Sequence, residues 1–251
     1  MPEYIETFAR MEKKYSMNKE QFNKLLREIG DRIEPDLYPR SVVNSIYFDT
    51  PDHKLIRRSL DKPMYKEKLR LRSYGGPVSP DTAAFAEIKK KYNGCVYKRR
   101  VDGKYQELMS WLCGEGPCPG DSQIHREIDY FISLNRSLAP AMQIAYKRLA
   151  YVLKEDHSIR VTFDTDILFR DRMLKRDGSA YGTRLIDKDT ILMEIKVSSK
   201  AIPVWLIRAV EKAGIQPSSI SKYGTAYVNT CGNGNMIVPQ IYEQRKVYAN
   251  A

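Results

Sequence analysis

The chain lacks any long uninterrupted hydrophobic run, and this absence excludes a helical membrane span. None of its apolar stretches approaches the roughly 18 to 20 residues that are needed to cross a bilayer. The charged beginning, MPEYIETFARMEKKY, also contains no apolar signal-peptide stretch. We therefore expect a soluble, cytoplasmic protein, for which any membrane partner would be a separate protein.

Cysteine and histidine are scarce, and their spacing excludes two further classes of protein. The cysteines form no CxxC pair and do not stand beside a histidine, so a zinc site or a disulfide framework is not expected. The histidines have no nearby Ser or Cys that would suggest a nucleophile with its base, which argues against a hydrolase triad. The residues concerned are Cys95, Cys113, Cys118 and Cys231, and His53, His125 and His157.

Positive charge is abundant by contrast. The sequence has 42 Lys and Arg against 31 Asp and Glu, a formal net charge of +11. Such a surplus faces either water or an anionic partner, and it points to a polyanion as ligand. The chain of 251 residues is long enough for one full core. We expect a single domain over residues 1–231, followed by a C-terminal tail over residues 232–251.

Hydrophobic periodicity predicts an α+β protein rich in strands. Most predicted strands follow one another closely and are joined by turn signals, which favours an antiparallel sheet. Strands are predicted over residues 8–16, 42–49, 63–74, 83–91, 95–101, 142–153, 159–169 and 191–197, with a loop at 175–178. Helices are predicted over residues 19–29, 51–60 and 203–213, with two more between 104 and 136.

Charged residues alternate with apolar ones along these strands. Because alternate side chains point to opposite faces, Lys66, Lys68, Arg70 and Arg72 share one face. An ordinary sheet with a solvated face would explain one such strand. Over several strands, however, neighbouring like charges repel, and an anion must offset the repulsion. If the sheet curls into a barrel with this face inward and with helices over its apolar exterior, the cations line a cavity that attracts polyanions strongly.

Carboxylates stand among these cations. Glu12, Glu87, Glu194 and Asp164 fall on the charged faces of their predicted strands. Carboxylate oxygens are the ligands that hard cations prefer, so these residues are candidates for holding Mg²⁺ or Mn²⁺ next to a phosphate chain. A plain salt bridge to a neighbouring Lys or Arg explains any single one of them equally well.

A series of short motifs resembles the polyphosphate polymerase domain called VTC. Each motif is weak alone, but nine occur in the same order with matching spacing along nearly the whole chain. They are residues 10–15 (RMEKKY), 45–50 (SIYFDT), 68–74 (KLRLRSY), 87–91 (EIKKK), 98–100 (KRR), 146–148 (YKR), 160–164 (RVTFD), 194–196 (EIK) and 221–224 (SKYG).

The resemblance implies a fold and a set of binding residues. The VTC family belongs to the triphosphate tunnel metalloenzymes, whose antiparallel barrel of about eight strands encloses a basic tunnel. The first strand reads Arg10-x-Glu12-x-Lys14 where many relatives have Glu-x-Glu-x-Lys, and this difference disfavours two-metal hydrolysis. The implied phosphate contacts are Lys14, Arg70, Arg72, Lys89, Lys98, Tyr146, Arg148, Arg160, Lys196 and Lys222, with Glu194 as the metal ligand.

The resemblance also implies a reaction, in which the γ-phosphoryl group of ATP passes to a growing inorganic polyphosphate and ADP leaves. Arg70, Arg72, Arg148, Arg160 and Glu194 are the predicted catalytic residues. Phosphoryl transfer of this kind needs alignment and charge neutralisation, which cations and Mn²⁺ or Mg²⁺ supply without a protein nucleophile. Two alternatives remain open: a tunnel triphosphatase, and a non-catalytic module that binds polyphosphate. Nucleic acid is disfavoured as ligand because the predicted cations face inward.

Overall fold

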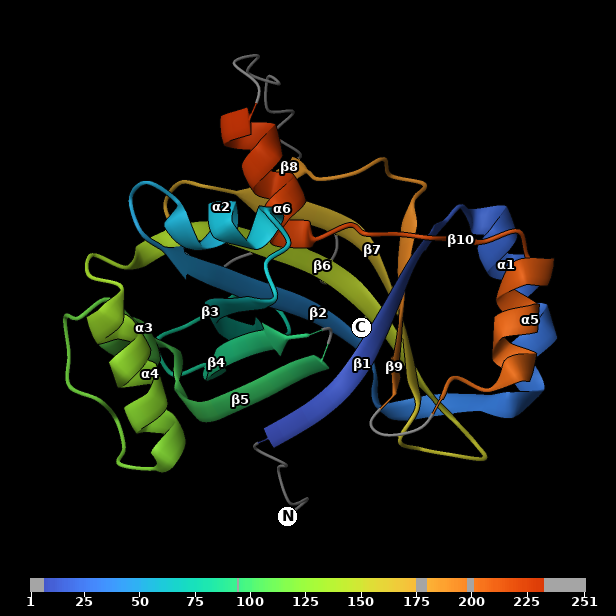
Figure 1. Cartoon of the computed structure of the whole chain (residues 1–251), viewed down its shortest axis with the longest axis horizontal. Helices are drawn as coiled ribbons and strands as arrows, with labels where there is room; N and C mark the ends of the chain where they lie inside the picture. The colour runs from blue at the N-terminus through green and yellow to red at the C-terminus, as the bar shows by residue number, and fades with distance from the viewer. Residues whose placement is uncertain (1–6, 94, 175–179, 198–200, 233–251) are drawn as a thin grey trace.

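The computed structural model describes residues 7–93, 95–174, 180–197 and 201–232 (Figure 1). The predicted loop at 175–178 and residues 233–251 of the predicted tail lie outside the described residues. The strands are β1 (Thr7–Met17), β2 (Ile33–Asp49), β3 (Tyr65–Tyr74), β4 (Ala83–Tyr92), β5 (Cys95–Lys104), β6 (Ala139–Leu153), β7 (Arg160–Arg170), β8 (Thr183–Arg184), β9 (Ile191–Val197) and β10 (Gln216–Pro217). The helices are α1 (Lys19–Ile29), α2 (Lys54–Leu60), α3 (Tyr105–Leu112), α4 (Gln123–Leu134), α5 (Val204–Lys212) and α6 (Lys222–Tyr227), with short turns of 3₁₀-helix at Gly30–Arg32 and π-helix at Val228–Gly232.

The predicted strands and helices are all present, and local sequence signals explain several of their ends. α1 begins with a capping box, in which the Asn18 side chain accepts a hydrogen bond from the Gln21 backbone at 2.9 Å. The Gln21 side chain accepts one from the Asn18 backbone at 3.0 Å in return. No helix in the described part of the chain is both long and apolar enough to span a membrane.

The strands form one large antiparallel sheet that curls back on itself. Its order is β10-β1-β5-β4-β3-β2-β6-β7-β8, and β9 pairs with both β1 and β7. The eight long strands therefore form a circuit of pairings, because β9 links the two ends of the row β1-β5-β4-β3-β2-β6-β7. The circuit gives the sheet an inner face and an outer face.

One edge of β1 leaves this circuit incomplete. β1 pairs with β5 only through Thr7–Arg10, because the short β4–β5 hairpin turns back before Cys95. β10 pairs with the same edge only at Tyr15 and Ser16. In the described residues, no strand pairs with this edge of β1 between Arg10 and Tyr15. The prediction of an α+β fold with a large antiparallel sheet is confirmed, whereas the prediction of a continuously closed barrel is not supported.

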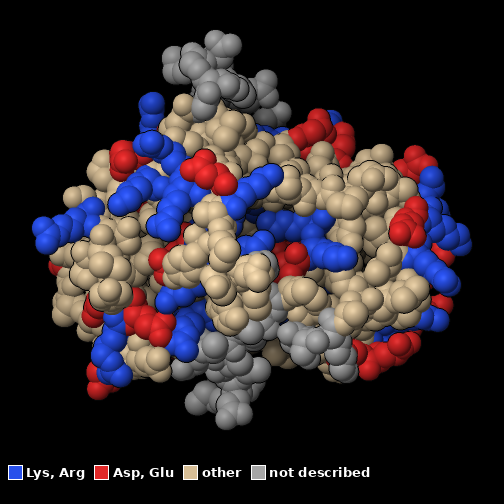
Figure 2. Space-filling model, viewed as in Figure 1, with Lys and Arg blue, Asp and Glu red and all other residues tan. Residues whose placement is uncertain are grey.

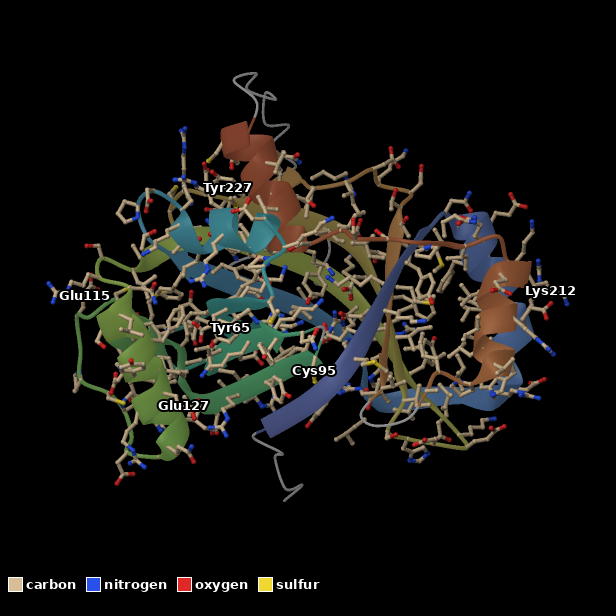
Figure 3. The ribbon with its side chains drawn as sticks, in the orientation of Figure 1. Tyr65, Cys95, Glu115, Glu127, Lys212 and Tyr227 are labelled. Atoms are coloured by element: carbon tan, nitrogen blue, oxygen red, sulfur yellow. The ribbon has the colours of Figure 1, made fainter. Side chains whose placement is uncertain are left out.

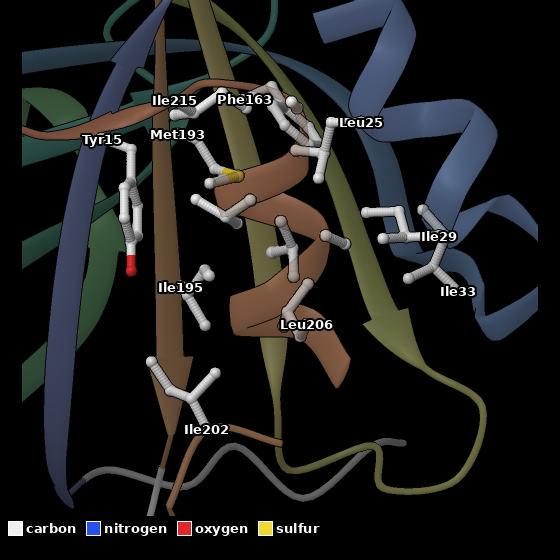
Figure 4. Packing of buried hydrophobic residues seen from close by; sticks show 14 of the residues in the cluster. Tyr15, Leu25, Ile29, Ile33, Phe163, Met193, Ile195, Ile202, Leu206 and Ile215 are labelled. Atoms are coloured by element: carbon white, nitrogen blue, oxygen red, sulfur yellow. The ribbon is translucent and has the colours of Figure 1, made fainter. Parts of the chain in front are cut away.

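The outer face of the sheet is apolar and is covered by helices. Leu25 and Ile29 of α1 and Leu206 of α5 pack on Phe163, Ile195 and their neighbours from β1, β7 and β9 (Figure 4). On the other side of the molecule, α3 and α4 cover β3, β4 and β5, where Leu69, Leu71, Ala86 and Ile88 are buried. Hydrophobic burial is therefore largely external to the curled sheet, which leaves the inner face for polar side chains.

A third cluster closes part of the inner face at the end nearest α2 and α6. Tyr223 and Ala226 of α6 pack there with Tyr47 of β2 and with Met142 and Ile144 of β6. The ring of Tyr223 stacks on that of Tyr47, with centroids 4.7 Å apart. The sequence did not predict α6, which is too short for a hydrophobic period to be seen.

Asp49 joins three elements at this closed end. This buried carboxylate accepts hydrogen bonds from the backbone N–H groups of Leu55 and Ile56 in α2, at 2.8 and 2.9 Å. It accepts another from the Tyr223 hydroxyl at 2.8 Å. These bonds also explain why α2 begins at Lys54 and not at the predicted Pro51, since the carboxylate satisfies the first free N–H groups of the helix.

Replacing Asp49 by Ala should therefore destabilise the fold. Loss of the charged acceptor leaves buried N–H and hydroxyl groups unpaired, and we expect the free energy of unfolding to fall by about 3 kcal/mol. Urea denaturation of the wild-type and variant proteins measures this difference. Asp61→Ala, at the exposed C-terminal end of α2, is the matched control and should stay within about 0.5 kcal/mol of wild type. Equal stability of the two variants would contradict the assignment.

Candidate functional site

Glu87 of β4 is the centre of a buried cluster of charges on the inner face. Its side chain has no exposed surface. Oε2 lies 2.7 Å from both Nε and a terminal nitrogen of Arg70, and Oε1 lies 2.8 Å from Nζ of Lys98. Nε of Arg72 is 3.7 Å from Oε2. Strands β3, β4 and β5 thus each contribute to the cluster, and both oxygens of Glu87 are engaged by cations.

The two arginines of β3 also reach β2 and β6. Arg70 donates to the Tyr47 hydroxyl at 3.2 Å, and Arg72 donates to Ser45 Oγ at 3.0 Å and to the Tyr146 hydroxyl at 3.4 Å. Alternation along β3 places both guanidinium groups on the inner face, because Leu69 and Leu71 occupy the outer one. These bonds hold both guanidinium groups in place.

A second cluster lies on β6 and β7. Arg148 makes a bidentate pair with Asp164, with Nε to Oδ1 at 2.7 Å and a terminal nitrogen to Oδ2 at 2.8 Å. Lys222, at the start of α6, donates to the same Oδ2 at 2.6 Å and lies 4.6 Å from the centroid of the Tyr146 ring. The helix that the sequence did not predict therefore carries a cation into the site.

The first and ninth strands supply the third group of charges. Lys89 of β4 donates to Glu12 of β1 at 2.7 Å. Nζ of Lys196 lies 2.9 Å from Glu194 of the same strand and 3.1 Å from Oγ1 of Thr162. Glu12 pairs with Lys196 across the ladder, and Lys14 pairs with Glu194, so the two carboxylates are diagonal neighbours on one face.

The segment before α6 orders two further lysines. Lys14 donates to the Ile220 carbonyl at 3.1 Å, and Lys68 donates to Ser221 Oγ at 3.2 Å. Nζ of Lys68 also lies 5.9 Å from the centroid of the Tyr223 ring. In Figure 2, Lys and Arg side chains gather over α2 and in the space between α2 and β1, with acidic side chains among them.

The structure brings most of the predicted site residues together. Arg160 lies opposite Lys196 in the ladder, on the inner side of β7, but its side chain is exposed at the end of this strand and pairs with Asp36 of β2 instead of joining the clusters. The side chain of Arg10 lies outside the described part of the structure. The inner face holds Glu12, Lys14, Lys68, Arg70, Arg72, Glu87, Lys89, Lys98, Tyr146, Arg148, Glu194, Lys196 and Lys222, together with Asp164.

Several inner-face residues escaped the sequence reasoning. Ser45 and Tyr47 accept hydrogen bonds from Arg72 and Arg70. Both residues are uncharged, so the search for charged faces did not select them. Arg100 lies on the same face of β5 as Lys98 and opposite Glu87, with its guanidinium carbon 4.5 Å from the centroid of the Phe85 ring. Period-two counting from Lys98 would have found Arg100.

Burial and mutual repulsion tune the lysines. Loss of solvation lowers the pKa of both Lys68 and Lys98 to about 8, although Glu87 partly opposes the effect on Lys98. Burial also lowers the pKa of Lys14. Burial raises the pKa of the carboxyls of Glu87 and Glu194, but the surrounding cations outweigh it and hold both pKa values well below the ordinary range. Glu87 and Glu194 therefore stay charged at neutral pH, whereas Lys68 and Lys98 lose their protons near pH 8.

Tyr47 is a buried phenol whose pKa is lowered by the surrounding cations. Burial opposes its ionisation, but Arg70, Arg72 and Lys68 outweigh burial and lower its pKa to about 7. The hydrogen bond from Arg70 acts in the same direction. The Tyr47 hydroxyl can therefore lose its proton near neutral pH.

The inner-face carboxylates Glu12, Glu87 and Glu194 are not equally suited to bind a metal ion. The described residues contain no ready group of three or more His, Cys, Asp or Glu side chains that could hold a metal ion. Both oxygens of Glu87 bind cations, so it does not fit the predicted role. Glu12 and Glu194 lie diagonally on one face of adjacent strands, and a phosphate chain would supply further oxygen ligands. These two fit Mn²⁺ or Mg²⁺ better.

Comparison with known families agrees with this arrangement. The model of the VTC domain matches residues 9–230, which is most of the chain. The chain belongs to the VTC domain family. The family resemblance that the sequence motifs predicted is therefore confirmed.

Individual relatives of this VTC-domain chain are distant. Subunit 4 of the vacuolar transporter chaperone complex of Trypanosoma cruzi (strain CL Brener) is 27% identical over 154 residues, which cover 51% of this chain and 19% of that protein. A proposed adenylate cyclase from Bacillus halodurans has a similar fold, with a TM-score of 0.55 and 14% identity over 86% of this chain and 96% of that one. One from Vibrio parahaemolyticus has a TM-score of 0.47 and 11% identity over 87% and 97% of the two chains.

The perturbed phenol can be detected directly. Ultraviolet titration of the wild-type protein should show one tyrosine that ionises near pH 7, because three cations face the Tyr47 oxygen. The step should disappear in Tyr47→Phe and remain in Tyr130→Phe, a control on the exposed face of α4. Identical titration curves for wild type and Tyr47→Phe would show that the cations do not act on this phenol.

Proposed function

We propose that this chain is a polyphosphate polymerase, which passes the γ-phosphoryl group of ATP to a polyphosphate held on the inner face. The observation that carries the proposal is the convergence of cations from six strands and α6 on one mostly buried face. Lys14, Lys68, Arg70, Arg72, Lys89, Lys98, Arg148, Lys196 and Lys222 outnumber the carboxylates Glu12, Glu87, Asp164 and Glu194 there. The uncompensated positive charge suits a chain of closely spaced phosphates.

The geometry supports transfer by positioning. Arg70, Arg72 and Arg148 are fixed by carboxylate, hydroxyl and phenol groups, so their forks are oriented before a ligand binds. Phosphoryl transfer needs the attacking and leaving oxygens in line and the charge of the transferred group neutralised. Lys68 and Lys98 supply charge close to the arginines without requiring a general base. These residues would hold both phosphate chains along the space that the curled sheet encloses.

A divalent ion completes the proposal. Glu194 and Glu12 would hold Mn²⁺ or Mg²⁺, which would supply positive charge to neutralise the charge that develops on the transferred phosphoryl group. Glu87, in contrast, orients Arg70 and Lys98, so its role is to position cations. Arg160 is not included in the catalytic set, because its side chain pairs with Asp36 at the surface.

A partner protein is also part of the proposal. The relative from Trypanosoma cruzi is named as a subunit of a transporter chaperone complex, and this chain matches only 19% of it. We infer that the chain acts together with separate subunits, one of which could be bound to a membrane. The chain then supplies the site that handles ATP and polyphosphate.

Activity of the purified protein tests the reaction. With ATP and Mn²⁺ the wild type should form long polyphosphate and ADP, resolved by gel electrophoresis and chromatography. Arg70→Gln and Glu194→Gln should each lower turnover by at least about a hundredfold, since transition-state charge is left unbalanced. Arg57→Gln, on the exposed face of α2, is the matched control and should keep its activity.

The products decide between the alternatives. Orthophosphate without a polymer would overturn polymerisation and would indicate a tunnel triphosphatase. Tight binding of polyphosphate without turnover of ATP would indicate a binding module. Full activity of Arg70→Gln, with an unchanged fold, would show that the inner face is not the site of reaction.

The pH dependence of polyphosphate binding is a separate test. Lys68 and Lys98 are protonated below their pKa of about 8 and neutral above it, so affinity should fall as the pH rises through 8. We expect roughly a tenfold loss in affinity, measured by titration with inorganic polyphosphate on either side of that pH. Lys68→Arg should reduce the loss because arginine stays charged, whereas Lys54→Arg on the exposed surface of α2 should leave it unchanged. An affinity independent of pH would contradict the role of these lysines.

A further inference from the structure

Aromatic side chains also lie on the inner face at the end of β3 and the beginning of β4, which is the end away from α6. Tyr74 and Phe85 lie on the same face as Arg72, since Phe85 pairs directly with Arg72 across the ladder and Tyr74 follows it by two residues. Their ring centroids are 6.0 Å apart and the rings are nearly perpendicular, at 74°. The Arg100 guanidinium stands over the Phe85 ring, 4.5 Å from its centroid.

These rings are out of place on a face that binds only phosphate. The face of an aromatic ring carries partial negative charge, so it attracts cations and repels phosphate oxygens. A heteroaromatic base, in contrast, stacks on Tyr or Phe and on the plane of an Arg guanidinium. Tyr74 keeps 41% of its surface exposed, so part of its ring is open to a ligand from solvent.

The other tyrosines of the site do not offer such a surface. Tyr47 and Tyr223 are buried and stacked on each other, and the Tyr223 hydroxyl is bound to Asp49. Tyr146 is buried between Arg72, Arg148 and Lys222. Among these inner-face rings, Tyr74 is therefore the one that a base could reach without displacing a core contact.

We propose that Tyr74, with Phe85 and Arg100, binds the base of the nucleoside triphosphate donor. The inference rests on the proposed function, in which ATP is used on the inner face, and it adds the place and direction of the nucleotide. Two residues of a strand span about 7 Å, so phosphates that continue from a base at Tyr74 meet Arg72 and then Arg70. The γ-phosphate would point towards Lys68, where the acceptor polyphosphate would meet it.

Stacking of this kind predicts weak discrimination between bases, because every base has a π-face. The contribution of the base is separable from that of the phosphates by comparing ATP with inorganic tripolyphosphate. The two ligands share the triphosphate and differ in the nucleoside. The ratio of their affinities therefore reports on the base alone.

Calorimetric titration of the full chain with the two ligands tests the proposal. Tyr74→Ala should weaken binding of ATP about tenfold and change binding of tripolyphosphate less than about twofold. Tyr74→Phe keeps the ring and should retain the affinity of the wild type for ATP. The matched control is Tyr65→Ala, at the start of the same strand but on its outer face, where the side chain is 37% exposed (labelled in Figure 3). It should change neither affinity.

Each result has one meaning. A similar loss for both ligands in Tyr74→Ala, or no loss for either, would overturn the nucleoside site and leave Tyr74 a structural partner of Phe85. A selective loss of ATP binding in Tyr65→Ala would place the base at the opposite end and would overturn it too. A nucleotide-selective loss in Tyr74→Ala would support it even where the wild type makes no polymer, so failure of the proposed reaction is distinguishable from failure of this inference.

Discussion

The ion pairs of Glu87 with Arg70 and Lys98 are the interaction on which the inner face depends. Cations from adjacent strands repel one another, and burial removes the water that would screen them. A carboxylate with no exposed surface, placed between the two strands, offsets this repulsion and orients the guanidinium group. Asp164 does the same for Arg148 and Lys222. Because carboxylates are fewer than cations, the fold keeps positive charge that only an anion can balance.

The same period-two pattern explains why the fold could be predicted from the sequence. Leu69 and Leu71 alternate with Lys68, Arg70 and Arg72, and the structure places the apolar set under α3 and α4 and the cations inside. The pattern could not predict the incomplete edge of β1, since this edge depends on where the β4–β5 hairpin ends. It also missed residues 33–41 of β2, where a bulge between Pro35 and Arg40 interrupts the alternation.

Alternation along the strands predicted which charged side chains would share the inner face. Face assignment recovered Arg70, Arg72, Lys89 and Lys98. It also placed Arg160 correctly on the face of Lys196, but it could not show that this side chain, at the exposed end of β7, pairs with Asp36. The partners of the carboxylates could not be predicted from the sequence either, because Glu87 binds Arg70 and Lys98 through packing between neighbouring strands.

The two ends of the inner face differ in a way that gives the site a direction. At one end α6 fills the space with Tyr223 and Ala226, and Asp49 fixes that helix to α2 and β2. At the other end Tyr74 is exposed beside Phe85 and Arg100. Phosphates are alike at every position along a polymer, so cations alone cannot tell one end of a substrate from the other. In the proposed reaction an exposed aromatic ring at one end, that of Tyr74, can do so, because only the donor carries a base.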